Sequence, residues 1–93
     1  MLLTLRQHAI QRMFERSIAL DEIRAALAHG SVIENYPDNT PYPSQLWLGY
    51  ADARPLHIVY ADNTPDQQRI IITVYQPDPA QWTPDLKTRR QIP

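Results

Sequence analysis

The chain has 93 residues, of which 43% are hydrophobic, contains no cysteine and has a formal net charge of -1 at pH 7. This length and apolar content support one hydrophobic core and therefore one domain. Disulfides and thiolate metal sites are excluded, and so is the general attraction to nucleic acid that a strongly basic domain has. Any phosphate binding must therefore depend on a local group of basic residues.

The N-terminal residues, MLLTLRQHAI, do not have the pattern of a targeting signal. They lack a basic region followed by a long apolar run, and no part of the chain approaches the roughly 18 apolar residues of a membrane span. We therefore expect a cytoplasmic protein that makes no contact with a membrane.

Residues 5–17 have the apolar spacing of an amphipathic helix. Rotation by 100° per residue places one continuous apolar arc on the helix, which we expect to face the core: Ala9, Ile10, Met13 and Phe14. A polar stripe with four-residue spacing adjoins this arc and consists of His8, Arg12 and Arg16. These three side chains therefore border the predicted core.

A second helix is predicted within residues 19–30, and the short joint before it implies a helical hairpin. Alternating apolar residues and turn-rich separators then predict strands over 32–36, 44–50, 54–60 and 69–75. This order is typical of an α+β fold. We predict that the N-terminal helical hairpin packs on a roughly four-stranded antiparallel sheet, all within a single domain over residues 1–83.

Residues 84–93 are predicted to form a loosely ordered basic tail. Residues 76–93 contain four prolines and cannot form one regular helix. The densest basic cluster of the chain lies here and consists of Lys87, Arg89 and Arg90. A solvated chain end explains such a cluster as well as a binding role does.

The stripe of His8, Arg12 and Arg16 combines side chains that suit a phosphodiester. Arginine offers paired donors to phosphate oxygens, and histidine exchanges protons near neutral pH. A structural role is the alternative: the arginine stems cover the edge of the core while the histidine caps the helix or packs against the sheet.

His57 and Tyr75 are the other candidate site residues. His57 lies in the middle of a predicted strand, where an imidazole needs a hydrogen-bonding partner and is often a satisfied core residue. Tyr75 lies at the end of the last strand, where it can line a cleft or pack on the sheet.

No metal and no cofactor is expected. The three histidines are too far apart in sequence for a zinc motif, and two glycines are too few for a phosphate-binding loop.

Several motifs in order identify a resemblance to a family of bacterial domains of unknown function, number 4258. They are HAIQRMFERSI, the strand entry VIENYP, the strand RPLHIVY and the ending IITVYQPDPAQW, and together they cover about residues 4–82. The resemblance implies a RelE-like fold and the toxin component of a bacterial toxin–antitoxin module, an endoribonuclease that needs no metal. It also implies RNA and a zinc-finger antitoxin as partners. The polar positions that match the family motifs are His8, Arg12, Glu15, Arg16, His57 and Tyr75.

Two functional hypotheses follow. In an endoribonuclease, His8 and His57 would exchange protons, Arg12 and Arg16 would stabilise the phosphate, and Tyr75 would orient it. This requires His8 or Arg12 to face the same cleft as His57. In the alternative, the protein is a non-catalytic protein-binding module with the same fold, and these polar residues hold the helices to the sheet.

Overall fold

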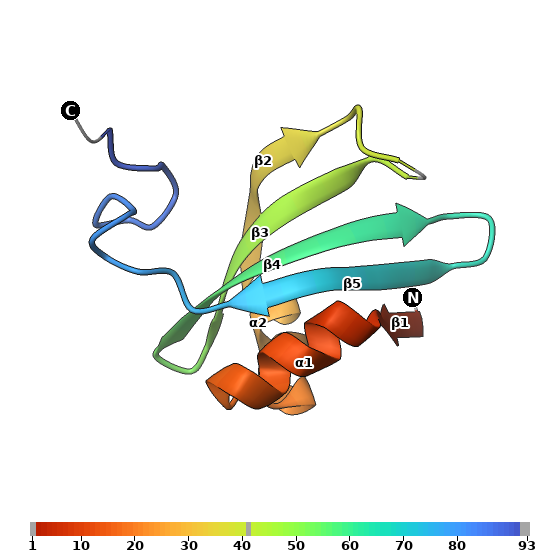
Figure 1. Cartoon of the computed structure of the whole chain (residues 1–93), viewed down its shortest axis with the longest axis horizontal. Helices are drawn as coiled ribbons and strands as arrows, with labels where there is room; N and C mark the ends of the chain where they lie inside the picture. Colours follow the sequence, from red (N-terminus) through yellow and green to blue (C-terminus); the bar gives the residue numbers. More distant parts are fainter. Residues whose placement is uncertain (1, 41, 92–93) are drawn as a thin grey trace.

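A computed structural model describes residues 2–40 and 42–91 of the chain (Figure 1). These residues form two α-helices and one five-stranded sheet, so the α+β class is confirmed. In chain order the elements are β1 (Leu2–Leu5), α1 (Gln7–Arg16), α2 (Leu20–Ala28), β2 (Gly30–Tyr36), β3 (Ser44–Ala51), β4 (Arg54–Asn63) and β5 (Gln68–Tyr75). Neither helix of this part of the chain is long and apolar enough to cross a membrane.

The sheet is mixed, with the strand order β1-β5-β4-β3-β2. β1 runs parallel to β5, and the other three pairs are antiparallel. The prediction of about four antiparallel strands was therefore wrong by one strand. β1 has only four residues, too few to show an alternating pattern. It is held in the sheet by pairing with Gln68–Ile71 of β5, which lie far from it in the sequence.

Both helices pack on the same face of the sheet (Figure 1). The core lies between the helices and the sheet, and β4 contributes Leu56 and Ile58 to it. Because successive strand residues point to opposite faces, His57 projects from the other face. We call this second face, which the helices do not cover, the His57 face.

The predicted core arc of α1 was only half right. Ala9 is fully buried and Met13 packs against the core, but the exposed fractions of Ile10 and Phe14 are 52% and 89%. α1 packs mainly against β5, near the margin of the sheet, so that only a narrow strip of the helix is covered. The polar stripe is also largely at the surface, since His8 and Arg16 are exposed and Arg12 is half-buried.

The chain continues from β5 into a segment without helix or long strand, which folds back on itself (Figure 1). Within it, Trp82 and Arg89 form an isolated antiparallel bridge, and Trp82 is 2% exposed. A loosely ordered tail over residues 84–93 stays a prediction, and residues 92 and 93 lie outside the described residues.

Candidate functional site

The pairing of β4 with β5 places His57 directly opposite Tyr75. The Nδ1 atom of His57 lies 3.1 Å from the Tyr75 hydroxyl, and its Nε2 atom lies 2.8 Å from the carbonyl oxygen of Leu86. A carbonyl oxygen only accepts hydrogen bonds, so Nε2 carries the ring proton and donates a hydrogen bond to the Leu86 carbonyl. Nδ1 is then the acceptor for the Tyr75 hydroxyl, and both ring nitrogens are satisfied.

His57 is fully buried in this arrangement. The Trp82 ring meets the imidazole edge to face, with 4.3 Å between the ring centroids. Burial lowers the pKa of His57 below its ordinary value of 6.5, because removing water disfavours the charged ring. The imidazole is therefore neutral at pH 7. Burial also raises the pKa of the Tyr75 hydroxyl, which stays protonated and able to donate.

Glu34 brings a carboxylate to the His57 face from β2. Its register partner is Leu46 of β3, and the carboxylate accepts a hydrogen bond from the hydroxyl of Tyr36. Burial has the largest effect on the pKa of His57, and the Leu86 hydrogen bond has the next largest. Of the two smaller effects, Arg89 lowers this pKa and Glu34 raises it. The two charges therefore act on the same imidazole.

Arg89 comes from the C-terminal segment and faces Glu34. Its Nε atom lies 3.9 Å from Glu34 Oε1, and its guanidinium lies 4.7 Å above the centre of the Trp82 ring. Sequence reasoning did not select Glu34 or Arg89 for the site. The signal for Glu34 was present, since it alternates with Tyr36 along one strand face within VIENYP, whereas nothing local in the sequence brings Arg89 to β2.

His8 and Arg12 are not brought to His57. Arg12 pairs with Glu15 at 2.9 Å, and its Nε atom lies 3.4 Å from Nε2 of His8, all on the surface of α1. Within residues 2–40 and 42–91, no hydrogen bond or ion pair joins His8 or Arg12 to His57. His8 and Arg12 thus form a local group on α1, separate from the contacts of Arg16.

Arg16 is the stripe residue that hydrogen-bonds to the strand carrying Tyr75. Its Nη1 atom donates to the carbonyl oxygen of Val74 at 3.3 Å. The charge of Arg16 also lowers the pKa of Tyr75, against the larger raising effect of burial. A cation from α1 is therefore available at the end of β5.

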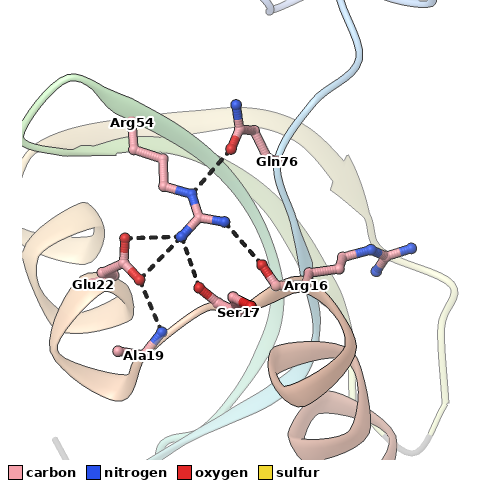
Figure 2. Close-up of polar contacts among 6 residues, drawn as sticks. All are labelled: Arg16, Ser17, Ala19, Glu22, Arg54 and Gln76. Atoms are coloured by element: carbon pink, nitrogen blue, oxygen red, sulfur yellow. Dashed lines mark hydrogen bonds and ion pairs between the residues drawn. The ribbon is translucent and has the colours of Figure 1, made fainter.

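Arg54, at the start of β4, fixes the helix hairpin to the sheet (Figure 2). Its Nη1 donates to both carboxylate oxygens of Glu22, at 3.1 and 3.0 Å, and to the Ser17 carbonyl at 3.0 Å. Its Nη2 donates to the Arg16 carbonyl and its Nε to the side chain of Gln76, each at 3.0 Å. Arg54 thus holds the backbone that carries Arg16, while the Arg16 guanidinium points away from it (Figure 2).

Among the described residues, no group of three or more His, Asp or Glu side chains lies in a metal-binding arrangement. The chemistry available at the His57 face is therefore that of a carboxylate, an imidazole, a phenol and a nearby guanidinium.

A family model described as a domain of unknown function, DUF4258, matches residues 5–76. The chain belongs to this family. The DUF4258 match begins at the end of β1 and stops just after β5, so it includes Glu34, His57 and Tyr75. Trp82, Leu86 and Arg89, which close over His57, lie outside the matched residues. No curated protein and no solved structure matches the chain.

Proposed function

We propose that this DUF4258 protein is the toxin component of a bacterial toxin–antitoxin pair, related to RelE-like toxins, and that it cleaves RNA without a metal at the His57 face. The observation that carries the proposal is the hydrogen-bonded pair of His57 and Tyr75, with the Glu34 carboxylate on the same sheet face. The resemblance in sequence to toxin-related domains supplies the substrate class. A fold alone does not establish an activity, and these side chains are what could supply the chemistry.

Metal-independent cleavage needs a base, an acid and a cation around one phosphate. Glu34 accepts the proton of the RNA 2′-hydroxyl as its oxygen bonds to phosphorus. His57, which is neutral while it is buried, takes up a proton once solvent reaches the ring and donates it from Nε2 to the departing 5′-oxygen as the other phosphorus–oxygen bond breaks. The products are a 2′,3′-cyclic phosphate and a free 5′-hydroxyl, and solvent restores both protonation states.

Tyr75 and Arg16 complete this arrangement. Tyr75 lies 3.1 Å from Nδ1 and orients the imidazole so that Nε2 faces the substrate. Arg16, at the same end of β5, stabilises the charge of the phosphorane. His8 and Arg12, which the sequence analysis placed in the same site, have no role in this mechanism because they lie on the surface of α1.

Cleavage of a synthetic RNA in the presence of EDTA tests the proposal, with mass spectrometry of the product ends. The full chain should yield 2′,3′-cyclic phosphate ends, and a 2′-O-methyl version of the same RNA should stay intact. His57→Ala and Glu34→Gln should each lower the rate by about 100-fold or more. His29→Ala is the matched control, because His29 is exposed at the end of α2.

A second candidate is supported by the burial of His57. Because both ring nitrogens are bonded and the side chain is fully buried, the same residues also suit a non-catalytic protein-binding module. In that case His57→Ala lowers the melting temperature, and no RNA is cleaved by the full chain or by a variant in which His57 is accessible. Cleavage that His57→Ala removes without loss of stability rejects this candidate.

A further inference from the structure

We propose that residues 78–91 form a detachable cover that holds the site at the His57 face closed and leaves as a unit when the site is used. We call this segment the cover. The biological meaning of the cover, regulation of RNA cleavage, rests on the function proposed above. The proposal that the cover opens as a separate unit does not depend on that function.

The cover occupies the groups that the proposed chemistry needs. The Leu86 carbonyl accepts a hydrogen bond from Nε2 of His57, the atom that faces the substrate in the mechanism. Trp82 closes over the same imidazole, and Arg89 places its positive charge beside Glu34. Substrate can therefore reach Nε2 of His57 only after the cover has moved, and it must displace Arg89 to bind at Glu34.

The cover is internally bonded, so it can move as one piece. The Thr83 amide donates to the Thr88 carbonyl, and the Arg90 amide donates to the Gln81 carbonyl, each at 2.8 Å. The Asp85 carboxylate accepts a hydrogen bond from the Thr83 hydroxyl and another, at 3.1 Å, from the Lys87 amide. Opening can keep these bonds and break mainly the contacts with β2 and β4.

Opening also leaves the main core intact. The buried cluster between the helices and the sheet contains no residue of the cover, and Trp82 packs on the opposite face. The family match ends at residue 76, before the cover begins. Segments with few contacts to the core open at a lower free energy than the whole domain does.

Leu86 offers a way to open the cover without changing the sheet. Its φ is 63°, in the left-handed region that disfavours leucine, and its own carbonyl is the one that bonds His57. Proline fixes φ near -65°, so Leu86→Pro cannot form the closed loop and also loses the amide that donates to Thr83. Leu86→Gly keeps the closed conformation accessible and is the matched control.

Acylation by diethyl pyrocarbonate, followed by peptide mass spectrometry, measures how accessible each histidine is. His8 and His29 are exposed and provide internal references. In the native chain and in Leu86→Gly, His57 should react at least about tenfold more slowly than His8 and His29. In Leu86→Pro the reactivity of His57 should rise to within a few-fold of theirs, while urea unfolding remains cooperative. Slow acylation of His57 in a folded Leu86→Pro variant overturns the proposal.

Hydrogen exchange in the native chain gives a second test that needs no substitution. The hydrogen bonds of the Thr83 and Arg90 amides lie inside the cover. These two amides should therefore exchange together when the detached cover unfolds, at a lower free energy than the opening that exposes the amides of β4. Exchange of all these amides in one global step overturns the cover, since the segment would then be part of the cooperative core.

RNA cleavage distinguishes the two proposals. If Leu86→Pro exposes His57 and cleaves RNA faster than the native chain, both stand. If it exposes His57 and neither protein cleaves RNA, the cover stands and the proposed ribonuclease function fails. If the native chain cleaves RNA while His57 is protected in both variants, the cover fails and the ribonuclease function stands.

Discussion

Arg54 connects more parts of this molecule than any residue that the sequence pattern emphasised. Its guanidinium bonds a carboxylate of α2, two carbonyls at the end of α1 and the side chain that follows β5. In the sequence, Arg54 is a basic residue beside a turn and a proline, which gives no sign of these partners. They come from three other places in the chain, and only the fold brings them together.

Arg54→Ala should lower the free energy of unfolding by about 2–3 kcal/mol, because it removes five hydrogen-bond donors and leaves partners unsatisfied. Arg54→Lys should recover little of this loss, since a single ammonium cannot bond all four groups. Urea unfolding measures both. Arg24→Ala is the control: Arg24 is exposed on α2 and should change the stability by less than about 0.5 kcal/mol. Equal losses for Arg54→Ala and Arg24→Ala would contradict this account.

His57 and Tyr75 show how much of the site the sequence could predict. Strand alternation correctly separated His57 from Leu56 and Ile58, but it does not say which face meets the helices. The contact between His57 and Tyr75 follows from the register of β4 on β5. Register depends on pairing between distant residues, and a single sequence does not display it.

At the scale of elements, α1 shows why an apolar arc is not always a buried one. Periodicity gives the direction in which apolar side chains point, and here it correctly predicted that Ala9 and Met13 face the core. The width of the covered strip depends on where the helix lies on the sheet. α1 packs mainly against β5 near the sheet margin, so the outer part of the arc, including Phe14, faces solvent.

Substitutions in α1 should reflect this placement. Phe14→Ser should change the free energy of unfolding by less than about 0.5 kcal/mol, because Phe14 is already 89% exposed. Ala9→Leu should cost about 1–3 kcal/mol, because it forces a larger side chain into a fully buried site. Thermal unfolding of the two variants provides the comparison. If Phe14→Ser is the more destabilising change, Phe14 is covered in solution, for example by a second copy of the chain.

The contact between α2 and β3 depends on Gly49. A Cβ atom at this position would lie 1.9 Å from the carbonyl oxygen of Ala26, and the same carbonyl accepts a hydrogen bond from the Trp47 indole at 2.9 Å. The helix backbone cannot yield as a flexible side chain would. The glycine therefore sets how closely α2 approaches the sheet.

Gly49→Ala should cost about 3 kcal/mol or more, since the added methyl group pushes α2 away and strains the Trp47 hydrogen bond. Urea unfolding measures the loss, and a red shift of tryptophan fluorescence should report the movement near Trp47. Tyr50→Phe, at an exposed position in the same strand, is the control and should leave both measurements near native values. A Gly49→Ala variant of native stability would show that α2 and β3 are not packed in this way.

For the whole molecule, the sequence indicated the α+β class but not the mixed sheet. Four strands were long enough to show a pattern, and all four occur in the structure. β1 joins the sheet through a parallel pairing with β5, which connects the first strand of the chain to the last. The C-terminal segment was equally hard to predict: its prolines exclude regular structure, but its contacts with His57 and Glu34 depend on the finished sheet.

The same arrangement makes the stability of the whole molecule depend on pH in two separate ranges. Burial lowers the pKa of His57 in the folded state, so the unfolded chain binds more protons near pH 6.5. The stability due to neutral His57 is present in full above that pH and is lost as the pH falls through the lower folded pKa. Hydrogen bonds from Ala19 and Arg54 lower the pKa of Glu22, so its contribution is lost only below about pH 4.5.

Urea unfolding at a series of pH values should therefore show a first decline that begins near pH 6.5 and a second below about pH 4.5. His57→Gln has no ionisable group at this position and should lose the first decline while it keeps the second. Tyr75, Glu34 and Arg89 face the imidazole, and all three stay in place in His57→Gln, so the comparison isolates the imidazole itself. A first decline that persists in His57→Gln would show that it does not come from His57 and that this residue is not buried as a neutral ring in solution.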